Sequence, residues 1–317
     1  MRVLVTGATG FVGRALCPAL ALCGHDVLAG VRKQVPGGAF VGIPSCVLGD
    51  IGTDPVTSAQ LAGADAIVHV ASRVHVMQES AADPLAAYRR VNVAGTVSLV
   101  RAAADAGVRR FVFLSSIKVN GEATGSVAFD EASPPAPVDP YGISKWEAER
   151  ALADLAERAG MEYVILRPPL IYGPGVGANF LRLIRLVEAG WPLPLASLHN
   201  RRSMLALGNL CDAIDCCLTH PAAVGQTFLV SDGRDVSTPE LIRVIAAAMG
   251  RPCRLFPFPP ALLRGLAASI GRGAEADRLL GSLAIDSARI RSLLQWQPPL
   301  DFEAAVKFAV DAYRAGG

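Results

Sequence analysis

The chain has 317 residues, a net charge of +2 and a hydrophobic content of 51%. This length is enough for one large domain or two modest ones, and the hydrophobic content argues against a disordered chain. The small net charge disfavours a nucleic-acid-binding protein. Strand-forming residues follow Met1 directly and no apolar run reaches spanning length, so we expect neither a signal peptide nor an integral membrane segment.

The spacing of the cysteines and histidines argues against a disulfide-bonded or metal-binding protein. The seven cysteines include no C-x-x-C pair, and Cys216 and Cys217 are neighbours that cannot easily form a disulfide. We therefore expect reduced thiols and a cytoplasmic protein. The histidines have no metal-ligand spacing, and we assign no metal to His25, His69, His75, His199 or His220.

The first predicted element is a strand over Arg2–Thr6, followed by a glycine-rich turn and a helix over Arg14–Cys23. Strand, G-x-x-G-x-x-G turn and helix together predict dinucleotide binding. Gly7 permits the tight turn, Gly10 lets the backbone approach a pyrophosphate, and Gly13 allows close packing of helix on strand. The free amides of the helix start would bind phosphate.

Arg32 and Lys33 follow the second predicted strand, where the adenosine ribose of a dinucleotide would lie. An acidic residue there would bind the 2′-hydroxyl of NAD, whereas an arginine accommodates the 2′-phosphate of NADP. No Asp or Glu ends this strand, which favours NADP(H), with NAD(H) as the alternative. A solvated basic turn is the other interpretation of the pair.

Strand-like and helix-like segments alternate through the first half of the chain. The further predicted strands are Asp26–Val31, Ser45–Leu48, Ala66–Val70, Arg110–Ser115 and Tyr163–Arg167. This alternation predicts an α/β fold with a Rossmann-like, doubly wound parallel sheet.

The pattern changes after residue 167 to Pro/Gly-rich turns with short helices. We assign residues 1–167 to a dinucleotide-binding domain and residues 168–317 mainly to a smaller substrate-binding lobe. Gln226–Ser231 is typical of a strand that returns to the first domain. A returning segment near residues 203–231 would therefore interleave the two parts.

A second motif lies on a helix predicted to begin with Asp139 as N-cap and Pro140 in the first helical position. Tyr141 and Lys145 lie four residues apart on one face of this helix. The helix dipole and the lysine charge both favour the phenolate of a residue whose ordinary pKa is about 10. The pair is a candidate acid/base set, although this spacing alone occurs by chance on many helices.

Taken in order, the glycine loop, the Ser115–Ser116 pair and the Tyr–Lys pair resemble the short-chain dehydrogenase/reductase superfamily. The length and early glycine spacing are similar to its extended branch, which modifies nucleotide sugars, and the resemblance covers essentially the whole chain. It implies that Ser116, Tyr141 and Lys145 are catalytic. Ser116 aligns with the family's catalytic hydroxyl when the Val-Asn-Gly that follows it is aligned with the family's usual Val-Tyr-Gly. Asn120 departs from this pattern, because it occupies the position of the tyrosine.

The resemblance also implies which residues contact the cofactor. They belong to the glycine loop, the ends of the second, third, fourth and sixth strands, the helix after the fourth strand and the acid/base pair: Gly7, Thr9, Gly10, Phe11, Val12, Gly13, Arg32, Lys33, Asp50, Ile51, Val70, Ala71, Ser72, Asn92, Tyr141, Lys145 and Pro168.

Substrate contacts are implied at four positions. Arg202 matches an arginine that binds the substrate diphosphate in sugar-nucleotide epimerases, and its planar guanidinium suits that task. Ser116, Lys118 and Asn179 are the other candidates. A surface position is the alternative for Lys118, and a helix N-cap is the alternative for Asn179.

The implied reaction is hydride transfer at C4 of a nucleotide sugar, with UDP-linked N-acetylhexosamine as the expected class. Tyr141 exchanges the hydroxyl proton, Ser116 binds the developing oxyanion, and Lys145 lowers the tyrosine pKa while binding the nicotinamide ribose. Arg32 favours a 4-keto reductase over the alternative, a UDP-sugar 4-epimerase. A homodimer is compatible with either enzyme.

Two other functions fit less well. A 4,6-dehydratase needs an acidic pair beside the catalytic hydroxyl, where this chain has Ile117 and Lys118. A non-catalytic dinucleotide sensor predicts loss of the acid/base set, which is present here.

The segment Leu255–Gly273 combines proline, phenylalanine and leucine with a few arginines. Docking on a membrane or a partner is one interpretation, but apolar residues at helical spacing favour packing within the smaller lobe.

Overall fold

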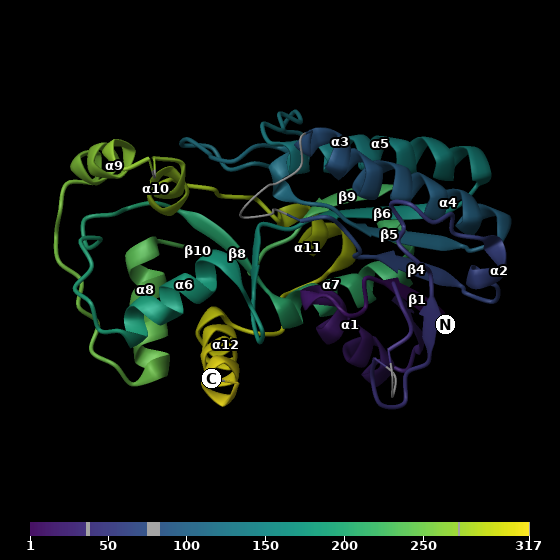
Figure 1. Ribbon diagram of the computed structural model, residues 1–317, viewed down its shortest axis with the longest axis horizontal. Coiled ribbons are helices and arrows are strands. Elements are labelled where there is room, and N and C mark those ends of the chain that lie inside the picture. The colour runs from purple at the N-terminus through teal and green to yellow at the C-terminus, as the bar shows by residue number, and fades with distance from the viewer. Residues whose placement is uncertain (36–38, 75–82, 272, 317) are drawn as a thin grey trace.

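The computed structural model describes residues 1–35, 39–74, 83–271 and 273–316, so His75 and Arg272 lie outside the described residues. Figure 1 shows a larger lobe, built on a broad sheet with helices on both faces, joined to a smaller lobe that ends in α9 and α10. In the described part of the chain, no helix is long and apolar enough to cross a lipid bilayer.

The large sheet has seven parallel strands in the order β3-β2-β1-β4-β5-β6-β9. They are β1 (Arg2–Thr6), β2 (Asp26–Val31), β3 (Ser45–Val47), β4 (Ala66–His69), β5 (Arg110–Leu114), β6 (Glu162–Arg167) and β9 (Gln226–Leu229). Each predicted strand is present to within two residues at either end. The strand order reverses between β1 and β4, and this switch point is where ligands bind to open α/β sheets.

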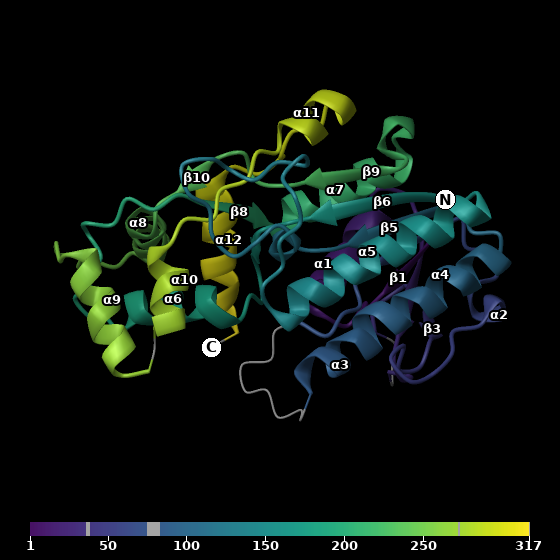
Figure 2. The ribbon, with the colours of Figure 1, turned by 90° about the horizontal axis from the view of Figure 1, so that it is seen from above.

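Helices cover both faces of this sheet, as Figures 1 and 2 show. One face carries α1 (Phe11–Leu22) and α7 (Leu207–Thr219), which form one core with β1 and β2. The other carries α2 (Ser58–Leu61), α4 (Gly95–Asp105) and α5 (Pro140–Ala159) over a second core. The predicted Rossmann-like, doubly wound fold is confirmed.

The smaller lobe contains a sheet that the sequence analysis did not predict. Its strands are β7 (Leu170–Tyr172), β8 (Arg202–Ala206) and β10 (Asp235–Val236), with β8 in the middle. The helices α6 (Ala178–Glu188), α8 (Thr238–Met249) and α12 (Phe302–Ala315) pack around it. Strands of two to five residues are too short to show the alternation of apolar and polar residues that indicates a strand. The sequence pattern of this region therefore predicted turns and helices.

Two later segments of the chain return to the larger lobe. The first consists of α7 and β9, and β9 pairs with β6 at the sheet edge. The second was not predicted: α11 (Ala288–Leu294) places Ile290 and Leu294 in the core that α1, α7 and β9 share, and Trp296 follows them there. The indole of Trp296 donates a 2.6 Å hydrogen bond to Asp212 on α7.

Candidate active site

The glycine loop has the backbone geometry that its motif predicts. Gly7 has a φ of +66°, which a residue with a side chain rarely adopts. A Cβ atom on Gly13 would lie 2.3 Å from the carbonyl oxygen of Gly7, so only glycine lets α1 pack this closely on β1. The N-cap of α1, Gly10, provides no side-chain cap, which leaves the first amides of the helix available for a phosphate.

A cleft of about 840 Å³ lies beside this loop. Its walls include many of the residues implied for the cofactor: Gly7, Thr9, Arg32, Lys33, Asp50, Ile51, Ala71 and Ser72. Residues from β1, β2, β3 and β4 therefore meet at one edge of the sheet. The cleft is large enough for the adenosine part of a dinucleotide and is open to solvent beside the exposed Arg32 and Lys33.

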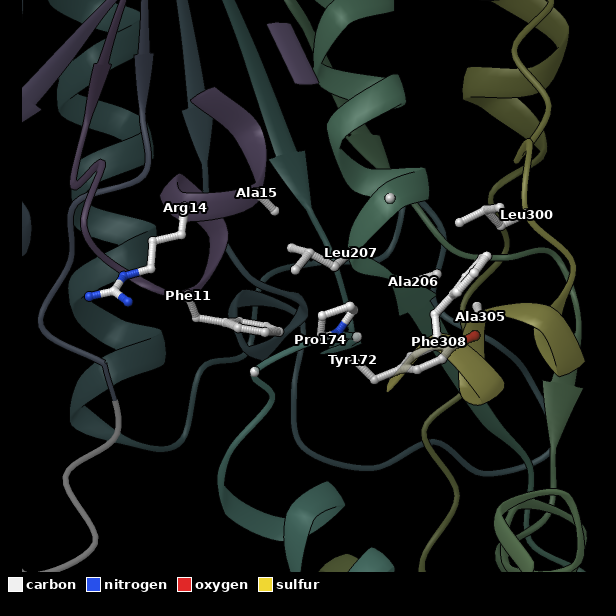
Figure 3. Close-up of a pocket in the computed structure, with 13 residues that line it drawn as sticks. Phe11, Arg14, Ala15, Tyr172, Pro174, Ala206, Leu207, Leu300, Ala305 and Phe308 are labelled. Atoms are coloured by element: carbon white, nitrogen blue, oxygen red, sulfur yellow. The ribbon is translucent and has the colours of Figure 1, made fainter. Parts of the chain in front are cut away.

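Phe11 lies differently from its prediction. Its side chain points away from that cleft into a separate, mostly apolar one of about 630 Å³, where it faces Pro174 and Leu207 while Phe308 closes the opposite side (Figure 3). Arg14 sits at the rim and points outward, with Nε donating to the carbonyl of Thr9 at 2.8 Å. The cofactor contact of Phe11 stays a prediction, and its side chain does not line the cleft beside the glycine loop.

The wall of the cofactor cleft is held from behind by a buried histidine. His69 lies 2.7 Å from the Thr6 hydroxyl through Nδ1 and 3.0 Å from the Thr96 hydroxyl through Nε2. Burial, with a smaller contribution from the charge of Lys145, lowers the pKa of His69 to about 3. The neutral ring is therefore structural. Thr6 in turn accepts from the amide of Ala71, which fixes the chain after β4.

Asn92 acts as a second support for this wall. It is buried in a π-helical turn (Arg89–Ala94) between α3 (Pro84–Tyr88) and α4. Its Oδ1 accepts from the Ser72 hydroxyl at 3.0 Å and from the Arg73 amide at 2.8 Å, while Nδ2 donates to the Ser144 hydroxyl at 2.9 Å. Asn92 thus joins the strand end to α5, behind the lining of the cleft.

Helix α5 begins as predicted. The carboxylate of Asp139 accepts from the Gly142 amide at 2.7 Å, and Pro140 is the first helical residue. Tyr141 follows in the first turn, close enough to Ser116, after β5, for the serine side chain to influence its pKa. Burial raises the pKa of Tyr141, and the Ser116 side chain partly opposes that shift. The structure therefore brings together the two hydroxyls of the predicted acid/base set.

Lys145 lies on the same helix, with its ammonium group at the sheet edge. Its Nζ donates to the carbonyl of Leu114 at 2.8 Å and lies 4.5 Å from the centre of the Phe113 ring. Burial lowers the pKa of Lys145 to about 7, against the opposing charge of Glu149. The groups that shift the Tyr141 pKa are Ser116, Asp139 and Tyr88, so the lowering of that pKa by Lys145 stays a prediction.

The depressed lysine pKa predicts a pH dependence of stability. Between about pH 7 and the ordinary lysine pKa of about 10.4, the unfolded chain binds a proton that the folded chain does not. The free energy of unfolding should therefore rise with pH in this window, by up to about 1.4 kcal/mol per pH unit. Urea unfolding of Lys145→Met at pH 7.5 and 8.5 should lack this increment. Equal slopes in both proteins would show that Lys145 is charged in the folded state.

Ser115 belongs to a buried polar network instead of the acid/base set. Its hydroxyl donates to Glu149, which also pairs with Arg167 at 2.5 Å with both side chains almost completely buried. Arg167 Nη1 reaches Asn120 Oδ1 at 3.1 Å, and Asn120 Nδ2 donates to the Ser133 carbonyl. The network joins the ends of β5 and β6 to α5. Asn120, the departure from the family pattern, thus has a structural role.

A cavity of about 370 Å³ lies in the smaller lobe, between α6, β8 and α10 (Gly273–Leu280). Asn179 and Arg202 both line it, together with Arg182, Arg278 and Thr238. Three arginines at one cavity suit an anionic group such as a diphosphate. The sequence analysis missed Arg182 and Arg278, although Arg182 lies three residues after Asn179, on the same face of α6.

Arg202 is partly held by its own lobe. Its Nη1 donates to the carbonyl oxygens of Arg278 at 2.5 Å and of Gly281 at 3.2 Å, and burial lowers its pKa. Asn179 is not the N-cap of α6, because Gly177 occupies that position. The alternative reading of Asn179 as a cap was therefore wrong.

The side chain of Lys118 forms ion pairs with two carboxylates of the larger lobe. Its ammonium group pairs with Glu122 at 2.7 Å and with Asp139, the N-cap of α5. Both the hydrogen bond from Lys118 and that from the Gly142 amide lower the pKa of Asp139 against the opposing effect of burial. Lys118 thus stabilises the start of the helix that carries Tyr141, which the prediction of a substrate contact did not anticipate.

Comparison with known proteins supports the chemistry of this arrangement. The model of the NAD dependent epimerase/dehydratase family matches residues 3–231. The chain belongs to this family. It is thus an enzyme of the extended short-chain dehydrogenase/reductase type, as the glycine loop and the Tyr–Lys pair predicted.

This chain is 43% identical over 317 residues to a UDP-glucose 4-epimerase of Vibrio cholerae. The alignment covers 98% of this chain and 95% of that protein. Among solved structures, MoeE5 in complex with UDP-glucuronic acid and NAD aligns over 100% of both chains, with a TM-score of 0.78 and 25% identity. The UDP-glucose 4-epimerase of Thermotoga maritima aligns over 100% of this chain and 99% of its own, with a TM-score of 0.79 and 20% identity, which shows a shared fold.

Proposed function

We propose that the protein is a 4-epimerase of UDP-linked hexoses that uses NAD(H). The observation that carries this proposal is the 43% identity, over nearly the full length of both chains, to the Vibrio cholerae UDP-glucose 4-epimerase. The geometry supports it, because Tyr141 and Ser116 lie close together at the sheet edge and three arginines line a cavity in the other lobe.

In this mechanism Tyr141 accepts the proton of the sugar C4 hydroxyl, and Ser116 donates a hydrogen bond to the oxygen as its charge develops. A nicotinamide bound in the cofactor cleft would supply the hydride acceptor and donor for C4. Inversion at C4 requires the 4-keto sugar to present its opposite face at the second hydride transfer. Tyr141 then gives back the proton, so that no net oxidation occurs. Arg202, Arg182 and Arg278 would bind the diphosphate throughout this change of face.

A 4-keto reductase is the second candidate, and Arg32 is the observation that favours it. Arg32 lines the cofactor cleft at the end of β2, where an arginine suits the 2′-phosphate of NADP. A reductase consumes an external reduced cofactor and releases it oxidised, whereas an epimerase recycles the same molecule.

One assay separates the two activities. The purified protein is incubated with UDP-glucose, UDP-N-acetylglucosamine and a UDP-4-keto-6-deoxy sugar, with and without NADPH, while absorbance and products are followed. Interconversion of C4 epimers without net cofactor consumption supports the proposal. Stoichiometric NADPH oxidation on the keto sugar, with no epimerisation, contradicts it and identifies a reductase.

The cofactor preference depends on Arg32. If its guanidinium binds a 2′-phosphate, NADPH should bind more tightly than NADH, and Arg32→Asp should reverse that order, because an acceptor for the ribose hydroxyl replaces a cation. Raising the salt concentration should reduce the selectivity of the wild type, because the site is exposed. Titration followed by nicotinamide fluorescence measures both affinities. A wild type that prefers NADH would remove this support for a reductase.

Arg202→Ala is expected to weaken the binding of UDP-sugars, because each lost charge-assisted hydrogen bond contributes roughly 1.5–3 kcal/mol. Affinity is measured by calorimetry with UDP-glucose and, as a control, with a sugar that lacks diphosphate. The control ligand should bind both proteins alike. Equal loss for both ligands, with a lower melting temperature, would show that Arg202 chiefly fixes the Arg278 and Gly281 carbonyls.

A further inference from the structure

Helix α9 (Pro260–Ser269) presents apolar side chains to solvent. None of its residues is fully buried, so the packing expected of residues 255–273 within the smaller lobe is seen only in part, at the partly buried Leu255 and Leu263. Leu262, Leu266 and Ile270 are 57%, 60% and 69% exposed, and their spacing of four residues places them along one side of the helix. Leu263, on another side, packs partly against the lobe. The outer side is thus an apolar stripe that no described residue buries.

The position of α9 leaves this stripe accessible. Figures 1 and 2 both show α9 at the end of the smaller lobe farthest from the large sheet, with α10 beside it. The nearby chain adds a further apolar group: Trp191 is 67% exposed. Hydrogen bonds from Leu193 to the Arg254 carbonyl and from Phe256 to the Leu193 carbonyl, at 2.8 and 3.0 Å, hold its segment beside the chain that leads into α9.

The charged residues of the segment that contains the stripe, residues 250–271, are all arginines, whereas α10 beside it carries the acidic Asp277. From Gly250 to Gly271 the charged residues are Arg251, Arg254 and Arg264, with no Asp or Glu among them. All three side chains are exposed, and Arg264 makes only a long, exposed pair with Asp277 at 3.4 Å. Leucine and tryptophan beside arginine are the composition of a surface that inserts at the boundary of an anionic bilayer.

We propose that α9 docks on the surface of an anionic lipid bilayer, with Leu262, Leu266 and Ile270 entering the headgroup boundary and the arginines contacting lipid phosphates. A second copy of the chain fits the stripe less well. A ten-residue helix is about 15 Å long and about 10 Å wide, so it offers roughly 150 Å², against about 800 Å² per partner in a standard interface. A membrane imposes no such minimum area.

Docking through α9 would have a consequence for the cavity of the smaller lobe. Helix α10 packs beside α9 and contributes Arg278 and Leu279 to that cavity. Binding would therefore place the arginine-lined cavity close to the lipid headgroups. The proposal concerns location only and does not depend on the epimerase activity.

The test is flotation of the full chain with vesicles of phosphatidylcholine alone or mixed with phosphatidylglycerol. The wild type should float with the mixed vesicles, and added salt should weaken this binding. Leu262→Glu/Leu266→Glu should lower the bound-to-free ratio by a factor of at least about ten. Arg251→Gln should lower it roughly five-fold, the effect of losing one cation near an anionic surface.

Leu22→Glu is the matched control, because Leu22 is 90% exposed on α1 of the larger lobe. It should float like the wild type, and every variant should keep the wild-type melting temperature. Failure of the wild type to bind mixed vesicles, or equal loss in the control, overturns the proposal. So does a change in mass by light scattering from dimer to monomer in the Leu262→Glu/Leu266→Glu variant without a change in flotation, which would assign the stripe to self-association.

Discussion

Replacing Tyr141 by phenylalanine is expected to lower turnover by a factor on the order of 10² to 10⁴, the range for a lost general acid/base. The substitution removes the hydroxyl that lies close to Ser116 and leaves the packing of the ring against Tyr88 in place, at 6.2 Å between ring centres. Cofactor affinity should change little, because the glycine loop and its cleft lie on other elements. Initial rates with a UDP-sugar and fluorescence titration of the cofactor measure the two quantities.

The neighbouring serines supply the control. Ser116→Ala should lower turnover with normal stability, since the Ser116 side chain lies beside Tyr141 and lowers its pKa. Ser115→Ala should chiefly lower the stability of the fold, because the Ser115 hydroxyl donates a buried hydrogen bond to the Glu149 carboxylate. Near-normal turnover of Tyr141→Phe would remove the tyrosine from the mechanism, and equal kinetic losses in the two serine variants would mean that the strand end is assigned one residue out of register.

Arg167→Ala is expected to cost about 3–5 kcal/mol of folding free energy, the range for removing one partner of a buried ion pair. The loss leaves the Glu149 carboxylate buried without its cation and deprives Asn120 of its donor. Domains are stable by only about 5–15 kcal/mol, so the variant should unfold at a much lower urea concentration.

An exposed pair provides the comparison for this effect. Lys307 and Asp311 lie one turn apart on α12 with side chains 64% and 45% exposed, and Lys307→Ala should cost less than about 1 kcal/mol. A double-mutant cycle with Glu149→Leu and Arg167→Met measures the coupling. Similar costs for the buried and exposed pairs would show that water reaches the Glu149 carboxylate.

The parts of the fold that follow local rules were predictable from the sequence. The strand at Arg2–Thr6, the glycine turn and the N-cap at Asp139 each depend on neighbouring residues alone, and each is present in the structure. The three-stranded sheet of the smaller lobe depends on pairing between distant segments. Leu170–Tyr172 is three residues long and becomes a strand only because β8 lies beside it.

The same division applies to the site. Tyr141, Lys145 and the glycine loop could be placed from motifs, since spacing on a single helix or turn determines their geometry. Arg278 could not be placed, because it reaches the cavity through contacts between α10 and β8 that no local pattern encodes. The ion pair of Lys118 could not be predicted for a related reason: its partner Asp139 lies 21 residues away in sequence.

The return of α11 to the larger lobe has a consequence for synthesis of the chain. Ile290, Leu294 and Trp296 complete a core whose first residues lie in β1 and α1. While the ribosome is still adding residues up to this point, the part of this core that packs against Ile290, Leu294 and Trp296 is open to water. The lobe that is synthesised first can therefore complete its core only when almost the whole chain has been synthesised. Nascent chains that stall before Trp296 should be good targets for chaperones and proteases.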